Sequence, residues 1–240
     1  TKSRAAYQKK FEKLGISVSE DEIFGSAYGT AVFLSTVSPL PQGKKVYVVG
    51  QDGIKDELRA KGIPLVDPFP TDKIEFSDDF WNSLQPDDEV GAVVCGFDID
   101  INYATLARAH TYLTRVEGCR YILTNGDTTF PAAGFAFPGT GALAAILTTS
   151  TGRQPVVIGK PHATLLDCIF QVHNLDRERT CMVGDRLDTD IQFGINGGLD
   201  TLLVLTGVTK EEQLLDPENQ IIPTYVMKSL GHVAHSLASV

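Results

Sequence analysis

The sequence lacks the features that would place it at a membrane or on nucleic acid. No apolar run approaches the roughly 20 residues that a membrane-spanning helix needs, and the polar start does not resemble a signal peptide. Lysine and arginine form nothing larger than isolated pairs, and the formal net charge is -9, so a nucleic-acid backbone would be repelled. We therefore expect a cytoplasmic protein with no membrane and no nucleic-acid partner.

Cysteine and histidine are also scarce and do not occur in metal-binding patterns. The four cysteines include no CxxC pair, and Cys95 and Cys181 lie in apolar strings, which predicts buried reduced thiols. The five histidines show no convincing ligand spacing. A zinc site and a disulfide framework are thereby disfavoured.

Short apolar runs that alternate with helical patterns make up most of the chain. A run of this kind flanked by helices is typical of a buried strand in a parallel sheet. The expected strands cover residues 46–50, 90–95, 121–124, 155–160, 181–185 and 201–206. We expect an α/β fold, in which the last three of these strands form a doubly wound parallel sheet.

Loop signals suggest how the chain divides. Proline and glycine interrupt the pattern near residue 40, after a helix that Ser19 and Glu22 should begin as a capping box. The segment 43–138 resembles a small α/β unit of its own, with a polar stretch at 67–88 and a loop rich in glycine and proline at 130–141. The main sheet should resume after that loop.

The strongest chemical signal is an acidic string at the end of an expected strand. The residues Gly184 to Asp190 contain three aspartates, and carboxylate oxygens are the ligands that magnesium prefers. Asp185 is the candidate direct ligand. Asp190 should orient the metal's water shell or accept hydrogen bonds from backbone N–H groups. Asp188 is better explained as a cap of the following helix.

Lys160 ends the preceding expected strand, between Gly159 and Pro161. A lysine in this position is often simply exposed to solvent. However, side chains at the carboxyl ends of neighbouring parallel strands meet in one crevice, so Lys160 and Asp185 should lie close together. An ammonium group, an acidic cluster and a cation would suit a phosphoryl group.

Two strings resemble motifs of a known family. Val157-Ile158-Gly159-Lys160-Pro161 and Met182 to Asp190 resemble the third and fourth motifs of phosphatases of the haloacid dehalogenase (HAD) superfamily. More narrowly, they look like the group of 4-nitrophenylphosphatases, phosphoglycolate phosphatases and pyridoxal phosphatases. Pro138 to Gly141 and Leu205 to Val208 also match this group, and the resemblance covers essentially the whole chain.

The resemblance implies a division of the chain and a role for each matching residue. Residues 1–42 would be the first part of a HAD-like core without its N-terminal strand, 43–138 an inserted α/β cap, and 139–240 the second part of the core. Within that framework Lys160 would hold the phosphate, Asp185 would bind Mg²⁺, and Asp190 would support the metal from behind. Relatives often form homodimers through the cap, which implies the same here.

The resemblance also points to substrate-contacting residues in the cap. Asn125, Asp127 and Phe130 match the cap loop that approaches the substrate in this group. Phe130 stands where pyridoxal phosphatases look to carry a histidine, which favours a small phosphate such as phosphoglycolate over a pyridoxal substrate. A core aromatic is an equally good explanation of Phe130.

The family's nucleophilic aspartate has no counterpart among the 240 residues. Asp98-Ile99-Asp100 has the right spelling but falls in the cap-like segment, so we interpret it as a decoy. The sequence thus predicts a Mg²⁺-dependent phosphatase that cleaves small phosphate monoesters through an aspartyl-phosphate, with its nucleophile upstream and this chain inactive alone. One alternative is a non-catalytic fragment or regulatory module that binds a phosphorylated metabolite. A receiver-like or nucleotide-binding domain is less favoured, because it does not explain the inserted unit.

Overall fold

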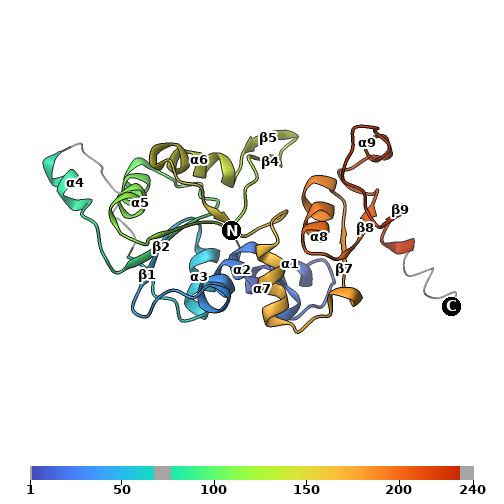
Figure 1. The fold of residues 1–240 in the computed structure, drawn as a ribbon, viewed down its shortest axis with the longest axis horizontal. Helices are drawn as coiled ribbons and strands as arrows, with labels where there is room; N and C mark the ends of the chain where they lie inside the picture. The colour runs from blue at the N-terminus through green and yellow to red at the C-terminus, as the bar shows by residue number, and fades with distance from the viewer. Residues whose placement is uncertain (1, 68–76, 233–240) are drawn as a thin grey trace. The chain divides into compact units, whose positions relative to one another are not determined.

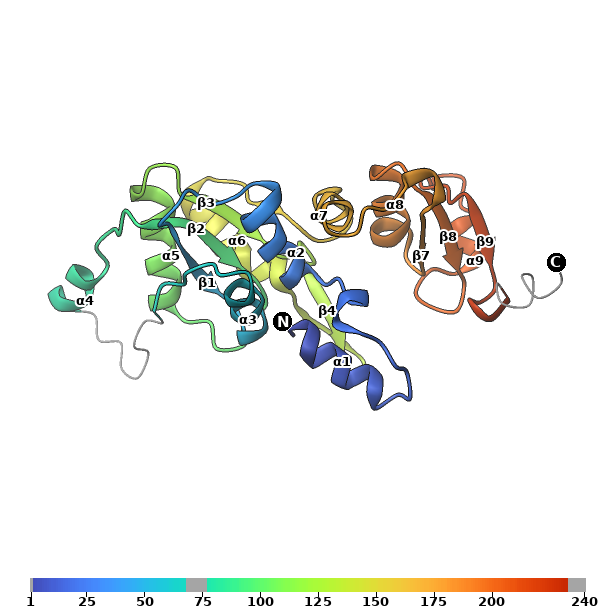
Figure 2. The same cartoon turned by 90° about the horizontal axis from the view of Figure 1, so that it is seen from below.

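The structure, a computed structural model, describes residues 2–67 and 77–232. The chain forms two compact units, Thr1–Gly159 and Lys160–Val240, called unit 1 and unit 2 below. Both units contain parallel β-sheet with helices (Figures 1 and 2), so the expected α/β fold is confirmed. No helix in the described part of the chain combines the length and the apolar character needed to cross a membrane.

Unit 1 is built on a four-stranded sheet in the order β1-β2-β3-β6. Its strands are β1 (Lys45–Val49), β2 (Val90–Cys95), β3 (Arg120–Leu123) and β6 (Val156–Val157). All three pairings are parallel, so the four carboxyl ends lie at the same edge of the sheet. All four strands lie within one residue of the apolar runs that predicted them, although β6 is only two residues long.

Helices cover both faces of this sheet, as Figure 1 shows. The helices are α2 (Ser26–Val32) and α3 (Asp52–Ala60) on one face, and α5 (Tyr103–Arg115) and α6 (Thr140–Thr151) on the other. The face toward α5 and α6 packs Tyr47, Val93 and Tyr121 against Tyr112 and Leu147 in one buried cluster. Apolar burial of this kind is the main stabilising contribution to a unit of this size.

The first helix, α1 (Arg4–Glu12), buries no residue and is held by its first turn. The main-chain N–H of Arg4 donates to Glu57 Oε1 at 2.6 Å, and its Nε donates to Glu57 Oε2 at 3.2 Å. Glu57 lies on α3 and is buried, and the Arg4 guanidinium also stacks over the ring of Tyr28 at 3.6 Å. This ion pair ties the start of the described chain to the sheet's helical layer.

Several helices and strands of the structure escaped the sequence analysis. The polar stretch 67–88, part of which lies outside the described residues, contains the short helix α4 (Asp78–Ser83). The expected loop at 130–141 contains an antiparallel hairpin of β4 (Thr129–Ala132) and β5 (Phe135–Pro138), with Ala133 and Gly134 at positive φ in its turn. The others are β9 (Tyr225–Met227) and the short helix α9 (Glu211–Leu214), both in unit 2.

Unit 2 contains a three-stranded parallel sheet in the order β7-β8-β9. The first two strands are β7 (Cys181–Gly184) and β8 (Asp200–Val204). The helical elements of unit 2 include α7 (Thr164–Val172), a π-helical turn (Leu187–Ile191), α8 (Gln192–Asn196) and α9 (Glu211–Leu214). The turn and α8 together form the helix expected after the acidic string. This sheet places the ends of β7 and β8 side by side.

Two expectations about the main sheet are corrected. The strand expected at 155–160 does not join the strands near 181 and 201; its short form β6 pairs with β3 in unit 1. Helix α6 likewise packs on α5, and the compact unit ends at Gly159 and not at residue 138. The division into core, cap and core stays a prediction, but the segment 139–159 belongs structurally with the sheet of β1, β2 and β3.

Two local predictions also need correction. Ser19 and Glu22 do form a capping box, with the Ser19 N–H donating to Glu22 Oε2 at 2.8 Å, but it caps a single 3₁₀ turn, and α2 begins later, at Ser26. Cys95, Cys119 and Cys168 are buried free thiols as predicted, whereas Cys181 is exposed. Cys181 is the first residue of β7, which is an edge strand of the three-stranded sheet that the described residues of unit 2 form.

Candidate functional site

Asp190 is the centre of a polar network at the carboxyl end of β7. Its Oδ1 accepts a hydrogen bond from Lys160 Nζ at 2.6 Å, which is also an ion pair. Its Oδ2 accepts the backbone N–H groups of Asp185 and Arg186, each at 3.1 Å. The Asp190 side chain is 8% exposed and that of Lys160 43% exposed. A buried carboxylate therefore fixes an ammonium group that still reaches solvent.

Asp185 is held from the neighbouring strand end. Its Oδ2 accepts the backbone N–H of Val208 at 2.7 Å, and its main-chain carbonyl accepts the N–H of Thr209 at 3.0 Å. The Thr209 hydroxyl in turn accepts the N–H of Leu187 at 3.3 Å. The loops after β7 and β8 are thus bonded to each other, which orients the Asp185 carboxylate.

Glycine at two positions allows the loops to close on these carboxylates. A Cβ on Gly184 would lie 2.2 Å from Asp190 Cβ, and one on Gly207 would lie 1.9 Å from Asp185 Oδ2. Both distances are far inside van der Waals contact, so any larger residue would displace a carboxylate. Glycine is therefore required at 184 and 207 by close packing against the carboxylates, and not by an unusual backbone conformation.

The aspartate oxygens suit a magnesium ion whose other coordination sites are occupied by water and phosphate. Asp190 already binds Lys160 and two N–H groups, and Asp188 pairs with Arg186 at 2.8 Å. Asp185 Oδ1 has no hydrogen-bond partner among the described residues. Within those residues no cluster of three or more histidine, cysteine, aspartate or glutamate side chains could hold a metal. Magnesium is commonly bound by one or two carboxylates plus substrate phosphate, so a single free carboxylate oxygen is compatible with it.

The three residues expected in the cap loop lie after β3 in unit 1. Asn125 Nδ2 donates to Asp127 Oδ2 at 2.7 Å, and the Thr124 hydroxyl donates to Asn125 Oδ1 at 3.1 Å. Phe130 lies on the hairpin strand β4 and packs edge to face on Phe97, with ring centroids 5.0 Å apart. Phe130 is partly exposed, so it is not a fully enclosed core residue. Contact of these residues with a substrate stays a prediction.

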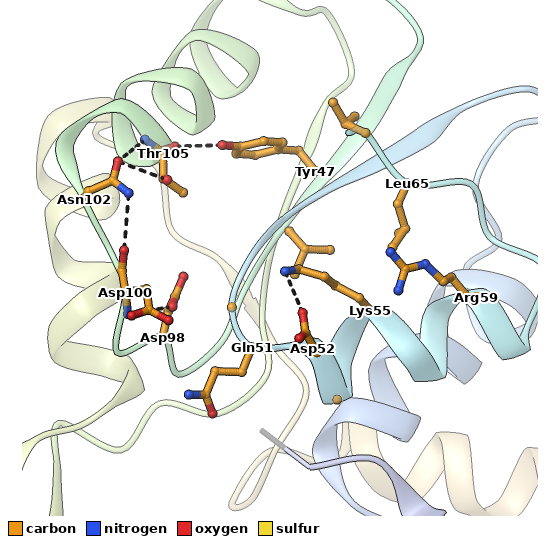
Figure 3. Close-up of a pocket in the computed structure, with 14 residues that line it drawn as sticks. Tyr47, Gln51, Asp52, Lys55, Arg59, Leu65, Asp98, Asp100, Asn102 and Thr105 are labelled. Carbon is orange, nitrogen blue, oxygen red and sulfur yellow. Dashed lines mark hydrogen bonds and ion pairs between the residues drawn. The ribbon is translucent and has the colours of Figure 1, made fainter. Parts of the chain in front are cut away.

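Unit 1 also has a cavity of about 610 Å³ at the carboxyl ends of β1 and β2, shown in Figure 3. Asp98 and Asp100, the string set aside as a decoy, line it together with Lys55 and Asn102. Lys55 is paired with Asp52 at 3.0 Å, and Asp98 accepts the N–H of Asp100 at 3.0 Å. The cavity has mixed charge, and its polar groups are largely bonded to one another, so it does not define a ligand.

The sequence predicted the main residues of the polar network but not the hydrogen bonds between them. Lys160, Asp185 and Asp190 do belong to one network in unit 2, joined through Asp190. The expected direct convergence of Lys160 and Asp185 on a phosphate-binding pocket stays a prediction, and neither residue lines the cavity of Figure 3. Thr209 was missed; the signal available was its position just after a strand end, beside Gly207 and Val208.

Comparison with known proteins identifies the family of this chain. The profile described as haloacid dehalogenase-like hydrolase matches residues 1–64, and the one described as HAD-hydrolase-like matches residues 157–233, which include the polar network. The 4-nitrophenylphosphatase of Schizosaccharomyces pombe is 41% identical over 238 residues, which is 98% of this chain and 80% of that protein. The chain belongs to the haloacid dehalogenase-like hydrolases.

A second curated relative and a solved structure are also similar to this chain. Phosphoglycolate phosphatase 2 of Arabidopsis thaliana is 41% identical over 241 residues, covering 99% of this chain and 79% of that protein. Among solved structures, the p-nitrophenyl phosphatase from Archaeoglobus fulgidus superposes with a TM-score of 0.81 at 33% identity, covering 98% of this chain and 82% of the other. The relatives of this HAD-like chain are thus phosphatases, as the sequence motifs implied.

Proposed function

We propose that this protein hydrolyses small phosphate monoesters in a Mg²⁺-dependent reaction, with 4-nitrophenyl phosphate and 2-phosphoglycolate among its substrates. The observation that carries the proposal is the network of Lys160, Asp190 and Asp185, in which a partly exposed ammonium and a free carboxylate oxygen are anchored on one buried aspartate. The two phosphatase relatives that are 41% identical support the substrate class.

Lys160 would bind the phosphate. An ammonium group has three N–H donors, and the structure accounts for one of them with Asp190. The remaining donors are available to phosphate oxygens, over which negative charge is spread in the transition state. Fixed positive charge at that position stabilises the transition state more than the same group would in bulk water.

Asp190 would act through its neighbours and not on the substrate. Its two oxygens are occupied by Lys160 and by the N–H groups of Asp185 and Arg186. It therefore sets the position of the ammonium and of the backbone that carries Asp185. Asp190 is a positioning residue, and its removal should disturb both of its neighbours together.

Asp185 would hold the magnesium ion through Oδ1, while its Oδ2 stays bonded to Val208. Bound magnesium supplies a compact positive charge that polarises phosphate oxygens. The hydrogen bond from Val208 restricts the rotation of the carboxylate, so Asp185 Oδ1 would need little rearrangement to become a ligand of the metal ion.

Hydrolysis in this scheme proceeds in two displacements at phosphorus. A carboxylate oxygen attacks phosphorus, and the alcohol or phenol oxygen leaves with the bonding electron pair and takes up a proton, giving an aspartyl-phosphate. Water then attacks that phosphorus and gives up a proton, the bond from phosphorus to the carboxylate oxygen breaks, and inorganic phosphate and the free carboxylate are released. The position of this nucleophilic aspartate upstream of Thr1, and the inactivity of the 240-residue chain alone, stay predictions. Cap contacts through Asn125, Asp127 and Phe130 would select the leaving group, and pairing of two copies through the cap is proposed on the resemblance alone.

The test is a hydrolysis assay with the protein expressed from its complete coding sequence and with the 240-residue chain in parallel. We expect Mg²⁺-dependent release of phosphate from both substrates by the former, and a loss of about 10²-fold or more in kcat with Lys160→Met or Asp185→Asn. Asp188→Asn, which alters an exposed carboxylate in the same string, should keep near-normal activity. Full activity in both Lys160→Met and Asp185→Asn would refute the site.

Calorimetric titration with inorganic phosphate separates catalysis from binding. A protein that binds inorganic phosphate by calorimetry, loses that binding in Lys160→Met and yet hydrolyses no ester would be the non-catalytic module that the sequence left open. Mg²⁺-independent turnover would instead argue against the role given to Asp185.

A further inference from the structure

The main chain beside Lys160 is held by a residue to which no role has been given so far. The carbonyl oxygen of Pro161, the next residue, accepts a hydrogen bond from Asn196 Nδ2 at 2.7 Å. Asn196 is the last residue of α8, so a helix that is distant in the sequence reaches the backbone directly after the ammonium-bearing residue. Both partners belong to unit 2.

A second hydrogen bond sets the orientation of the Asn196 amide. Gln192, one turn earlier on α8, donates from Nε2 to Asn196 Oδ1 at 2.7 Å. An amide oxygen accepts and an amide nitrogen donates, so the bond from Gln192 directs Nδ2 toward Pro161. Asn196 is exposed, and ordering an exposed side chain costs conformational entropy, which these two bonds help to offset.

Asp190 and Asn196 lie on one helical stretch, because the π-helical turn at Leu187–Ile191 continues directly into α8. Asp190 binds Lys160 Nζ at 2.6 Å, while Asn196 binds the main chain next to Lys160. A lysine side chain has a flexible four-carbon stem, so a contact at the ammonium alone leaves its main chain free to shift. Attachment at two points from the same helical stretch defines the position of the ammonium much more closely.

The end of α8 is also joined to α7, the helix that follows Lys160. Arg177 Nη1 donates to the carbonyl of Gly197, and Nη2 pairs with Asp167 of α7 at 3.6 Å. A Cβ on Gly197 would lie 2.0 Å from Leu166 Cδ1, so the two helices are in close contact there. The loop between Lys160 and α7 therefore has little freedom relative to α8, and Asn196 holds the part of it nearest to Lys160.

We infer that Asn196 is a positioning residue of the phosphatase reaction, which sets the place of the Lys160 ammonium through the carbonyl of Pro161. The inference rests on the proposed function, because Asn196 acts only through Lys160. A small displacement of a phosphate-binding group lowers the rate steeply. Since every substrate has the same phosphoryl group, the loss should not depend on the leaving group.

The test is Asn196→Asp, assayed in the protein expressed from its complete coding sequence. This change keeps the size of the side chain but turns the amide donor into a carboxylate that faces the Pro161 carbonyl. We expect kcat/KM to fall about 10-fold, by the same factor for 4-nitrophenyl phosphate and 2-phosphoglycolate. Asn219→Asp makes the same replacement at an amide that donates to the carbonyls of Leu214 and Ile221, and it should keep near-normal activity. Circular dichroism checks that both variants are folded.

A double variant separates positioning from a purely structural role. In the Lys160→Met background, Asn196→Asp should cause no further loss, because the ammonium that it positions is already absent. A purely structural defect would instead lower kcat/KM by the same factor in both backgrounds.

The inference alone is overturned by turnover that requires Lys160 but is unchanged in Asn196→Asp. Additive losses in the double variant, or an equal loss in Asn219→Asp, would overturn it as well. If the wild type shows no Mg²⁺-dependent turnover, the proposed function fails, and calorimetry with inorganic phosphate decides the role of Asn196. Binding about 5-fold weaker in Asn196→Asp would support positioning of Lys160, whereas unchanged or undetectable binding would refute it.

Discussion

Strands β2 and β7 are similar in sequence and differ in environment. Val90–Cys95 and Cys181–Gly184 are both continuous apolar strings, yet every residue of β2 is buried, while β7 alternates between exposed and half-buried positions. Strand β2 lies between β1 and β3, with helices on both faces, whereas β7 is the edge of its sheet. An apolar string predicts a strand, but its burial depends on how many neighbours the fold provides.

The two units therefore depend on different interactions. Unit 1 owes its order to a large apolar cluster between its sheet and helices α5 and α6. Unit 2 has the polar network in which Asp190 and Asp185 join the ends of β7 and β8. The stability of unit 1 comes mainly from apolar surface removed from water. In unit 2, directional hydrogen bonds set the positions of the polar side chains.

The largest contrast should appear when the same substitution is made in both strands. Val93 is fully buried and Val183 is 38% exposed. We expect Val93→Asp to cost about 4 kcal/mol or more, because it buries an unpaired charge, and Val183→Asp to cost about 1 kcal/mol. Urea unfolding followed by Trp81 emission and circular dichroism measures both. Equal losses would show that the contrast between the strands is wrong.

A smaller effect should follow removal of the buried aspartate of unit 2. Asp190→Ala leaves Lys160 and two backbone N–H groups without their acceptor, and we expect a loss of about 2–3 kcal/mol. Asp188→Ala breaks an exposed pair with Arg186 and should cost less than about 0.5 kcal/mol.

Hydrogen exchange gives the specific readout for this pair of variants. The amides of Asp185 and Arg186 should exchange faster in Asp190→Ala and not in Asp188→Ala. Unchanged protection of both amides would mean that the network does not hold the loop.

Unit 1 offers the same comparison between buried and exposed ion pairs. Glu57→Gln should cost about 1–2 kcal/mol, because Glu57 is buried against Arg4, while Glu89→Gln, in an exposed pair with Lys45, should cost less than about 0.5 kcal/mol. Thermal unfolding measured by calorimetry tests this. A larger loss for Glu89→Gln would contradict the assignment of Glu57 as the anchor of α1.

The smallest effect is expected from chemical labelling of the cysteines, which tests the exposure of each thiol and leaves the fold intact. Burial raises the pKa of Cys95 to about 12 and that of Cys119 to about 11. A raised pKa keeps a thiol protonated, so these groups form little reactive thiolate at about pH 8 and react faster only as pH rises toward the pKa.

Cys181 is exposed, although desolvation raises its pKa as well, so it should be labelled first. Titration with a thiol reagent should show one fast group in the native protein, absent in Cys181→Ser. Two or more fast thiols would indicate that the buried cysteines are more accessible than the structure has them.

Local signals explain what could be predicted. Continuous apolar runs located β1, β2 and β3, and the glycine that ends α3, Gly62, has φ of +71° as a helix-terminating glycine should. The hairpin of β4 and β5, the helix α4 and the strand β9 carry weak local patterns. They form because contacts with residues distant along the chain stabilise them, and a short stretch of sequence does not contain that information.

The candidate site shows the same limit. The types and spacing of Lys160, Asp185 and Asp190 indicated phosphate and magnesium chemistry, because carboxylates and an ammonium after buried strands have few structural uses. The sequence did not reveal that Asp190 binds Lys160, since these residues lie 30 positions apart. Nor did it reveal the support of Asp185 from Val208 and Thr209 across the sheet.

The sequence by itself determined the fold class, most strand positions and the chemical character of the acidic string, because these depend on apolar periodicity and on residue type over short distances. Only the tertiary structure decided that β6 joins β3, that β7 lies at an edge, and which oxygen of each aspartate is occupied. Pairing and burial depend on contacts between residues distant along the chain, and those contacts are fixed by the packing of the whole unit.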